Sequence, residues 1–553
     1  MDLITRKQSL SASQGVVTSN HPVASSVGIS ILASGGNAFD SAVGTAFALS
    51  VVEPMMVGPF GAGFTNFFRP NKGFSTIDGY GSAPGEAYET MYKPISNDLP
   101  QYFDVEDQLN QNGYLSAGTP GNLLAWTHLI EKYGNFPLEE IIQPSINIAR
   151  NGFRVTDYLS DIIKDNIAEL SNYKESANIY LPNGRAPEKG EIIKNSNYAL
   201  TLEGIAKYGA AYLHEGDLGK HIEDEMKKNG GLITLDDLKR QKIFYREPIV
   251  GNYKGYKINS VGPVSSGGIC LIQMLNILEN FNIEKYNIFD SERIHIISEV
   301  FKIVFADRYK YIGDPEYVKI PTHGLISKKY ALERANEINL NKAQSYKYTN
   351  NFLDNDSNNT THFNVADNEG NIVSMTQTIN NAFGSKVAVE GTGMMLNNCM
   401  LLFDPHHGNA NSIQPYKRSL SSMTPTIISK DNKPFVALGT PGGRKIFGSV
   451  CQAILAIIDN KFNLQSAVES PRIWTDGDIL ELEYEFPNES INKLNSLGHK
   501  TSSIQKVAGG MNAIMFKNST MEGSACHRAD GSPAGLSGGY ALPSEPGDAF
   551  NWE

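Results

Sequence analysis

A threonine at the end of a polar segment has the setting that most favours chemistry in this chain. Residues 354–359 are Asp, Asn and Ser, and an alternating strand pattern begins after Thr360. If the bond between Asn359 and Thr360 were cut, Thr360 would offer a hydroxyl nucleophile and an α-amino base on one residue. That amine has an unperturbed pKa of roughly 7.7 to 8.0, so part of it is neutral near physiological pH. An ordinary loop-to-strand junction has the same composition and is the commoner case.

Two further patterns could assist an attack on an amide. Gly442 and Gly443 precede a predicted helix, so their backbone N–H groups and the positive end of the helix dipole could stabilise an oxyanion. Ser421 and Ser422 could donate hydrogen bonds to a carboxylate or a carbonyl group. Taken alone, each pattern is more often a turn or a loop.

The composition is that of an acidic globular protein. The chain has 553 residues, of which 41% are hydrophobic and 19% charged, and a formal net charge of -11. No basic run resembles a surface that follows phosphates, so nucleic acid is not an expected partner. The first residues lack the apolar core of an export signal, and no apolar run approaches a membrane span. We therefore expect a cytoplasmic protein with no membrane partner.

Cysteine and histidine spacing gives no sign of a metal. The cysteines lie far apart without a C-x-x-C pair, at Cys270, Cys399, Cys451 and Cys526. This spacing argues against a zinc site or a disulfide framework and favours buried free thiols. Adjacent His406 and His407 would point in opposite directions on an extended chain, so we expect them in a solvated loop.

Strand and helix patterns are mixed along the whole length. Strands at 361–366 and 371–379, joined by a turn at 367–370, predict a hairpin that begins just after Thr360. A helix from about residue 37 to residue 52 is rich in small apolar residues and should be buried. We find no repeat and no long linker, so we expect sheets covered by helices in one compact body.

The same signals predict the other elements. Pro137 and Pro144 are expected in the first turns of helices. Further helices are expected at 22–32, within 121–166, and at 198–208, 218–228, 235–240, 269–281, 291–308, 327–338 and 444–458. Further strands are expected at 15–19, 64–68, 75–78, 245–251, 256–260, 423–429 and 435–439.

With these residues in view, the chain resembles the gamma-glutamyltranspeptidases, also called glutathione hydrolases, over nearly its full length. The resemblance rests on a series of ordered motifs: Gly35-Gly36-Asn37-Ala38, Val51-Val52-Glu53-Pro54, Thr119-Pro120-Gly121, Pro263-Val264-Ser265-Ser266-Gly267-Gly268, Phe305-Ala306-Asp307-Arg308, Thr360-Thr361-His362-Phe363, Thr376-Gln377-Thr378-Ile379-Asn380, Lys417-Arg418 with Ser421-Ser422-Met423, and Pro441-Gly442-Gly443.

The resemblance implies an N-terminal-nucleophile hydrolase with an α+β fold, a four-layer αββα sandwich. It also implies a proenzyme that cuts itself between Asn359 and Thr360. The products would be a large subunit, 1–359, and a small catalytic subunit, 360–553, which remain together as a heterodimer in one compact body. Thr360 would then attack a γ-glutamyl or related amide of a small molecule, and water or another amine would resolve the acyl-enzyme. No cofactor or metal is implied.

The same resemblance assigns roles to the other site residues. Thr378 matches the position that hydrogen-bonds the nucleophile, and Gly442 and Gly443 match the oxyanion hole. The substrate contacts are matched by three residues of the small subunit: Asn380, Ser421 and Ser422.

Two departures concern the glutamyl group. The family commonly has an Arg-Glu step before Ala-Pro, whose arginine holds the α-carboxylate, but this chain has Tyr80 in the corresponding stretch, 78–84. Where the family has an acidic pair that holds the α-ammonium, this chain has Leu401 and Leu402. An ammonium beside two leucines would suffer a desolvation penalty of roughly several kcal/mol.

The sequence therefore leaves the identity of the acyl group undecided. A γ-glutamyl amide is the family default, and a related acylase of the kind that acts on cephalosporin side chains, oxamate or poly-γ-glutamate is the rival. We expect weak or absent transfer to amino-acid acceptors. A third reading is a catalytically silent member kept as a binding protein, although such a protein would be expected to have lost at least one of the matched residues.

Overall fold

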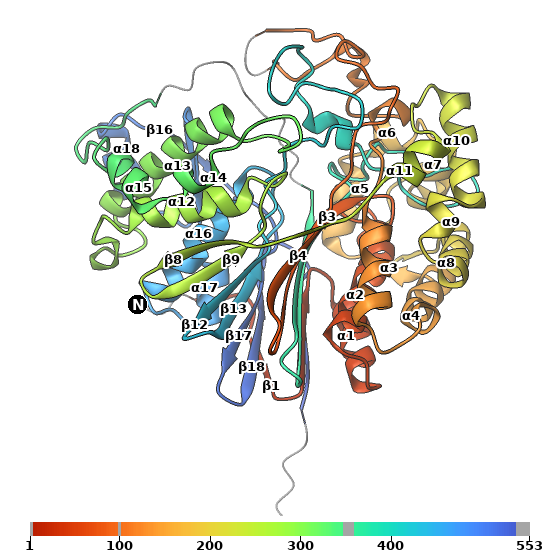
Figure 1. Cartoon of the computed structure of the whole chain (residues 1–553), viewed down its shortest axis with the longest axis horizontal. Helices are drawn as coiled ribbons and strands as arrows, with labels where there is room; N and C mark the ends of the chain where they lie inside the picture. The colour runs from red at the N-terminus through yellow and green to blue at the C-terminus, as the bar shows by residue number, and fades with distance from the viewer. Residues whose placement is uncertain (1–3, 98–100, 347–358, 538–553) are drawn as a thin grey trace, which may run out of the picture.

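Two antiparallel sheets lie face to face at the centre of the molecule, and helices cover both outer sides (Figure 1). The structure is a computed structural model that describes residues 4–97, 101–346 and 359–537. Its four layers are those of the αββα sandwich, so the predicted fold class is confirmed.

Both sheets have seven strands. The first has the order β1-β18-β17-β13-β12-β9-β8, with bounds Leu10–Ala12, Thr520–Ala525, Asn512–Lys517, Lys433–Gly439, Thr426–Lys430, Tyr256–Ser260 and Ile249–Tyr253. The second has the order β19-β2-β10-β11-β3-β4-β7, with bounds Ser532–Leu536, Gly15–Ser19, Thr361–Asp367, Ile372–Thr378, Ala62–Arg69, Gly73–Gly79 and Phe244–Arg246.

The helices form the two outer layers. Against the second sheet lie α1, Pro22–Ala33, and α2, Ala38–Val52. Against the first lie α12, Gly267–Leu278, α16, Lys445–Ile458, and α17, Leu464–Glu469, and α13, Ser291–Tyr311, packs on α12. Other helices extend these layers: α3 Asn122–Tyr133, α4 Leu138–Asn151, α5 Asp157–Lys164, α8 Ser196–Tyr208, α10 Asp217–Asn229, α11 Leu235–Arg240, α15 Lys328–Ala335 and α18 Asn488–Ser496.

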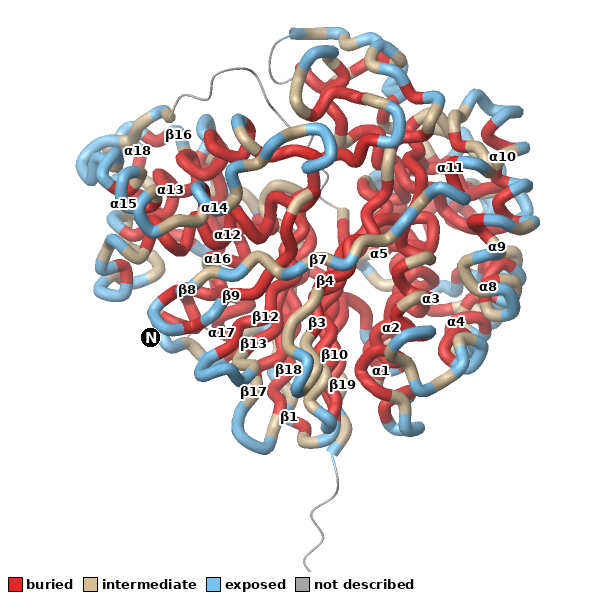
Figure 2. The backbone as a smooth tube through the Cα atoms, viewed as in Figure 1, coloured by how far each residue is buried: buried red, intermediate tan, exposed pale blue. Residues whose placement is uncertain are grey.

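The hairpin predicted after Thr360 is β10 and β11, and it lies in the middle of the second sheet. β10 pairs with β11 on one side and with β2 on the other, so all of its residues are buried (Figure 2). Phe363 and Val365 pack in the cluster shared with α2, whereas Ala366 packs between the sheets. This alternation is that of a strand with covered faces on both sides.

The helix α2 is buried along its whole length, as its composition predicts. Asn37 and Asp40 form a capping box that satisfies its first backbone N–H groups. α2 packs on β10 and on the helices α1 and α4, and a Cβ added at Gly44 would collide with Ile31 Cδ1 of α1, so glycine allows α1 and α2 to approach closely.

Side-chain amides also join the two sheets. Asn364 of β10 donates to the Asn512 carbonyl at 3.0 Å, and Asn512 of β17 donates back to the His362 carbonyl at 2.8 Å. These bonds satisfy buried polar groups that would otherwise cost stability. They lie close to the residue that starts β10.

Prolines explain three differences from the predicted elements. Pro144 lies inside α4 and not in a first turn, because the apolar pattern of that helix continues through it. The strand expected at 245–251 divides into β7 and β8 at Pro248, which has no N–H to donate. β12 begins after Pro425, three residues later than expected, for the same reason. The sequence prediction also missed β1 and the strands after α16.

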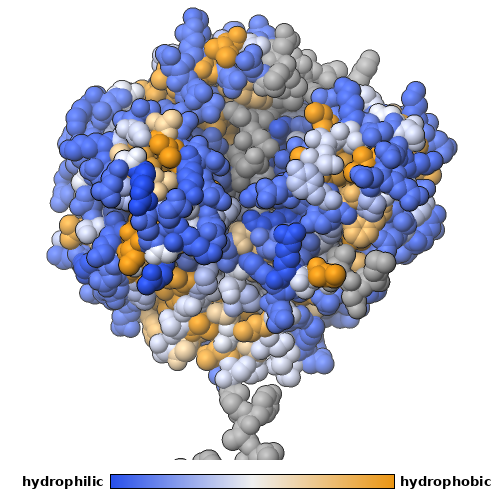
Figure 3. Space-filling model, turned by 180° about the vertical axis from the view of Figure 1, so that it is seen from behind, coloured by the Kyte–Doolittle hydropathy of each residue, from blue (hydrophilic) through white to orange (hydrophobic). Residues whose placement is uncertain are grey.

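On the face shown in Figure 3, hydrophobic residues form small patches scattered among hydrophilic ones. Within the described residues, no helix combines the length and the apolar character that crossing a bilayer requires.

Candidate active site

A pocket of about 40 Å³ lies where β10 begins. It is lined by most of the residues that the sequence singles out: Tyr80, Thr360, Thr378, Asn380, Leu402, Ser421, Ser422 and Gly443. Since one water needs roughly 10 to 15 Å³ of such space, the pocket is large enough for a few waters. The fold thus brings these residues together around Thr360.

The Thr378 hydroxyl connects the candidate nucleophile to the bond that is expected to break. Thr360 Oγ1 donates to Thr378 Oγ1 at 3.2 Å, and Thr378 Oγ1 donates to the carbonyl oxygen of Asn359 at 2.7 Å. The backbone N–H of Asn380 donates to the same hydroxyl at 2.8 Å. The three contacts fix the direction of the Thr378 proton, which points at the Asn359 carbonyl.

Asn380 reaches the pocket through an unusual backbone conformation. Its φ is 79°, in the left-handed region that asparagine tolerates better than most residues. Its side-chain Nδ2 donates to the Asn398 carbonyl at 3.0 Å. The chain therefore turns sharply after β11 and keeps Asn380 beside Thr378.

The paired serines are held by the loop before α12. The backbone N–H and the side-chain hydroxyl of Ser266 both donate to the Ser421 carbonyl, at 2.8 and 2.7 Å. The N–H of Ser421 donates in turn to the Val264 carbonyl at 3.2 Å. Ser422 receives a hydrogen bond on its hydroxyl from Arg308 Nη2 at 3.1 Å. These contacts present both serines to the pocket.

The two glycines predicted for the oxyanion hole have different surroundings. Gly443 lines the pocket with a φ of 55°, and α16 begins two residues later. Gly442 has a φ of 134°, and a Cβ added there would lie 2.5 Å from the Cβ of Ala508. Gly442 therefore has no room for a side chain, and Gly443 adopts a backbone conformation that favours glycine, but only Gly443 belongs to the pocket lining.

Two arginines that line the pocket were assigned no role from the sequence. Arg308 lies on α13 with 1% of its surface exposed, and Arg444 lies just before α16. Arg444 donates to Asp476 Oδ2 at 2.6 Å and to the Tyr309 hydroxyl at 3.0 Å. The available signal for Arg308 was its place in the Phe305-Ala306-Asp307-Arg308 motif, and its burial adds to that signal because buried arginines are rare without a specific task.

Arg418, which precedes the serines in sequence, does not line the pocket. It is paired with two buried carboxylates, with Nη1 2.8 Å from Asp78 Oδ2 and Nη2 2.9 Å from Asp314 Oδ1. Asp78 also accepts from the N–H of Tyr80 at 3.0 Å. Arg418 therefore supports the turn that carries Tyr80.

Both departures noted in the sequence lie in the pocket that contains Thr360. Tyr80 and Leu402 line the pocket, and Tyr80 stacks on Phe64 with ring centroids 5.2 Å apart. None of the described residues that line the pocket is acidic. The described lining therefore offers hydroxyl and guanidinium donors but no anion for an ammonium group.

A buried carboxyl group contacts Thr361, the residue that follows Thr360. Thr361 Oγ1 donates to Glu53 Oε2 at 2.8 Å, and Glu53 ends α2. Complete burial raises the pKa of Glu53 to about 8, and the nearby charge of Asp530 acts in the same direction. The carboxyl group is therefore protonated at neutral pH.

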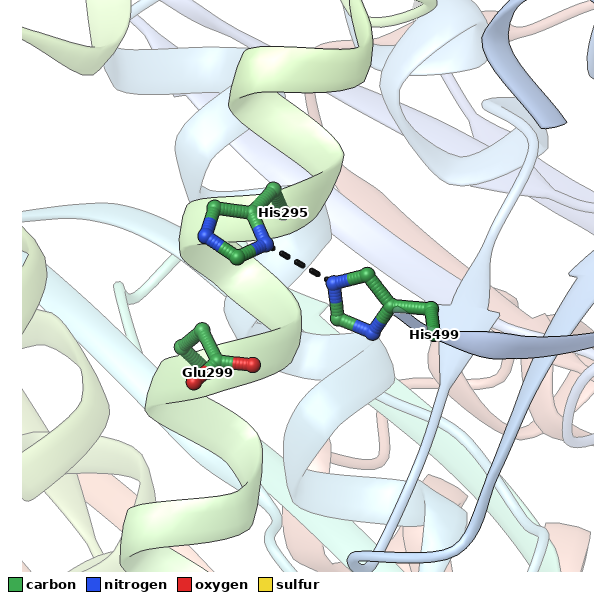
Figure 4. Close-up of side chains that lie close together, drawn as sticks. All are labelled: His295, Glu299 and His499. Atoms are coloured by element: carbon green, nitrogen blue, oxygen red, sulfur yellow. Dashed lines mark hydrogen bonds between the residues drawn. The ribbon is translucent and has the colours of Figure 1, made fainter. Parts of the chain in front are cut away.

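The described residues bring one set of potential metal ligands together: His295, Glu299 and His499 (Figure 4). His295 Nε2 donates to the Asn339 carbonyl at 2.9 Å, and its Nδ1 lies 2.8 Å from His499 Nε2. Burial lowers the pKa of His499 to about 3, with Lys302 and His295 acting in the same direction, so that ring is neutral.

The carboxylate of this cluster already has three donors. Lys302 Nζ lies 2.8 Å from Glu299 Oε1, and Oε2 accepts from the Gln344 N–H at 3.1 Å and the Tyr346 hydroxyl at 2.8 Å. The positive Lys302 would also repel a cation. We therefore interpret the cluster as a hydrogen-bonded joint between α13, the 339–346 segment and the start of β16, Lys500–Ile504.

The remaining predictions concern cysteine and histidine. All four cysteines are buried free thiols, as expected. His407 is exposed, but the prediction of a solvated loop is wrong for His406. The His406 ring stacks on Tyr102 with ring centroids 4.1 Å apart, and its Nδ1 lies 3.2 Å from Asp404 Oδ1.

Comparison with known proteins gives one consistent family. The sequence model described as "Gamma-glutamyltranspeptidase" matches residues 24–536. The "Acylase ACY 1 proenzyme" of Pseudomonas sp. strain SE83 is 43% identical and is aligned over 98% of this chain and 97% of its own. The "Glutathione hydrolase proenzyme" of Escherichia coli K12 is 36% identical over 91% and 88%. Among solved structures, a cephalosporin acylase from Bacillus halodurans has a TM-score of 0.87 at 28% identity and covers 97% and 98%.

Proposed function

Because this chain belongs to the gamma-glutamyltranspeptidase family, we propose that it cuts itself before Thr360 and then uses that threonine to transfer an acyl group from an amide to water. The observation that supports this most directly is the Thr378 hydroxyl, which bridges Thr360 Oγ1 and the Asn359 carbonyl oxygen.

The self-cleavage is an intramolecular acyl shift. Thr360 Oγ1 attacks the Asn359 carbonyl carbon, and its proton passes to Thr378 as the Thr378 proton passes to the carbonyl oxygen. The C–N bond then breaks with protonation of nitrogen, which leaves an ester between Asn359 and the Thr360 side chain. Water hydrolyses the ester and releases the Asn359 carboxylate and the α-amine of Thr360.

The released amine completes the catalytic residue. It accepts the proton of the Thr360 hydroxyl as that oxygen attacks the substrate amide, and it returns the proton to the departing amine. In this proposal the backbone N–H groups of Gly442 and Gly443, together with the start of α16, would stabilise the oxyanion, and Gly443 lines the pocket. Water then attacks the acyl-enzyme and restores Thr360.

Denaturing electrophoresis with amino-terminal sequencing of the purified protein tests this proposal. We expect two fragments, with a new amino terminus at Thr360, and hydrolysis of an acyl anilide. Thr360→Ala should stay a single chain without activity, whereas Thr360→Ser, which keeps a hydroxyl, should still be cut. A single persistent chain in the wild type at varied pH and time would instead favour the silent binding protein.

A second candidate concerns the acyl group: an amide whose acyl part has no α-ammonium. It is favoured by Leu402 and by the lack of an acidic side chain among the described lining residues, and two of the similar proteins are named acylases. Placing an ammonium there without a partner costs roughly several kcal/mol.

A matched pair of substrates separates the two candidates. We expect the 4-nitroanilide of glutaric acid, which lacks the amino group, to have a higher kcat/KM than γ-glutamyl-4-nitroanilide. Faster turnover of the γ-glutamyl compound would show that the pocket satisfies the ammonium in some other way. It would favour a γ-glutamyl amide, the family default, as the substrate.

A further inference from the structure

We infer that Arg308 is a positioning residue that makes the Ser421–Ser422 side of the pocket selective for a carboxylate on the acyl group. The inference rests on the proposed function, because it concerns which amides Thr360 attacks. It assigns a role in recognition to a residue of the predicted large subunit, on α13.

The guanidinium group of Arg308 lies inside the protein and holds two loops together. Its Nε donates to Ser266 Oγ at 2.9 Å, and its Nη2 donates to Ser422 Oγ at 3.1 Å. Ser266 in turn donates to the Ser421 carbonyl. Both pocket serines are therefore fixed by one side chain, directly for Ser422 and through Ser266 for Ser421.

The contact between Arg308 and Ser422 determines whether the Ser422 hydroxyl acts as a donor or as an acceptor toward the pocket. A hydroxyl has one proton to donate, and Ser422 Oγ uses a lone pair to accept from Arg308. In the described part of the chain this is the only hydrogen bond that Ser422 Oγ makes. Its proton remains available to an acceptor in the pocket, and the neighbouring positive charge strengthens that donation.

The charge of Arg308 also determines which acceptor is preferred. Bringing a carboxylate out of water is costly unless a positive charge and hydrogen bonds compensate for it. Arg308 has 1% of its surface exposed, so water screens its charge less than it would at the surface. A neutral group of the same shape would receive the Ser422 hydrogen bond but little benefit from the charge.

Two matched anilides and one substitution test the inference. The substrates are whichever acyl 4-nitroanilide the wild type hydrolyses and its mate in which a carboxamide replaces the free carboxylate. In Arg308→Gln we expect KM for the carboxylate substrate to rise by roughly a hundredfold with kcat little changed, while KM for the carboxamide changes by less than about threefold. Arg308→Lys should recover only part of the selectivity, because lysine lacks the planar fork that reaches both Ser266 and Ser422.

Controls separate recognition from folding. Arg293 is also buried on α13 but bonds to the Ile283 carbonyl and to Asn460, so Arg293→Gln should leave the carboxylate preference unchanged. If Arg308→Gln does not fold, Ser422→Ala keeps the charge and removes the hydroxyl, and we expect a roughly tenfold loss for the carboxylate substrate.

Two kinds of failure remain distinguishable. Equal losses on both substrates in a variant that still cuts itself before Thr360 would overturn the role of Arg308 alone. A wild-type protein that neither cuts itself nor hydrolyses any anilide would overturn the proposed function, and the inference would fall with it.

Discussion

At the scale of single residues, the proposed self-cleavage depends on the Thr378 hydroxyl, which contacts both the attacking Thr360 hydroxyl and the Asn359 carbonyl group. Thr378 accepts from the nucleophile and donates to the carbonyl that the nucleophile would attack. Asn380, two residues later, holds that hydroxyl with its backbone N–H. The sequence identifies these residues through their motif, but the direction of the Thr378 proton is visible only in the structure.

Replacing Thr378 by valine removes the hydroxyl and keeps the shape. We expect Thr378→Val to slow self-cleavage by roughly a hundredfold or more, since one donor to a developing oxyanion is worth about that much. A time course of fragment appearance on denaturing gels measures it. Thr378→Ser retains the donor and should stay within about tenfold of the wild type; if the valine variant is cut as fast as the serine variant, the hydroxyl has no such role.

Glu53 gives the stability of the protein a dependence on pH. Its pKa is raised to about 8 in the fold, so between its ordinary value and about 8 the folded chain holds a proton that the unfolded chain has lost. That difference makes stability fall as pH rises, by up to about 1.4 kcal/mol per pH unit.

We therefore expect Glu53→Gln, which stays neutral and can still accept from Thr361, to gain stability relative to the parent between pH 5 and pH 8. Thermal midpoints measured in the uncut Thr360→Ala background at the two pH values test this. Substitution of the exposed Glu139 by glutamine is the control. If the thermal midpoints of Glu53→Gln and its parent differed by the same amount at both pH values, the carboxyl group would not be protonated in the fold.

At the scale of elements, local sequence patterns predict those helices and strands that local interactions determine. The hairpin β10–β11 and the buried helix α2 follow from alternation, turn residues and small apolar composition, and all are found at the expected residues. What the sequence could not show is which distant elements meet. Arg418 is next to the serines in sequence but pairs with Asp78 and Asp314, whereas Arg308, more than a hundred residues away in sequence, contacts Ser422.

The same long-range packing explains why the sequence patterns did not predict strands at the edges of the sheets. β1 has only three residues and is fixed by its pairing with β18, which comes from the other end of the chain. A strand this short carries almost no periodic signal of its own. Similarly, Pro144 is tolerated in α4 because the tertiary packing of the apolar face outweighs the loss of one backbone hydrogen bond.

The joint at α13 makes a prediction at this scale. Glu299→Gln would leave the buried Lys302 without its carboxylate, and we expect a loss of about 3 to 5 kcal/mol in stability. Combining it with Lys302→Met should restore much of that loss, because no buried charge is then left unpaired. Thermal midpoints of both single variants and the double variant, in the Thr360→Ala background, measure the coupling; strictly additive losses would contradict an interacting pair.

At the scale of the whole molecule, the position of Thr360 divides the chain but not the fold. Among the residues that the structure describes, five strand pairings join residues before Thr360 to residues after it: β1–β18, β9–β12, β2–β19, β2–β10 and β3–β11. Each of the two central seven-stranded sheets thus contains strands from both predicted subunits. Neither fragment has a complete central sheet of its own.

We expect the two fragments to elute together in gel filtration without denaturant, at the size of the uncut chain or of an oligomer of it. Mild treatment that separates the fragments should abolish the secondary structure of both, which circular dichroism can follow. Recovery of a folded, soluble fragment on its own would show that the sheets are less shared than the pairings indicate.

The interleaved sheets also change what it means for this protein to unfold. Before the cut, refolding is a first-order event, because every strand is tethered to its partners by the same backbone. After the cut, the strands of one sheet belong to two molecules, so refolding becomes second-order and slows on dilution. The mature protein would then persist because unfolding is slow and not because it is readily reversed, and self-cleavage would exchange reversible stability for kinetic stability.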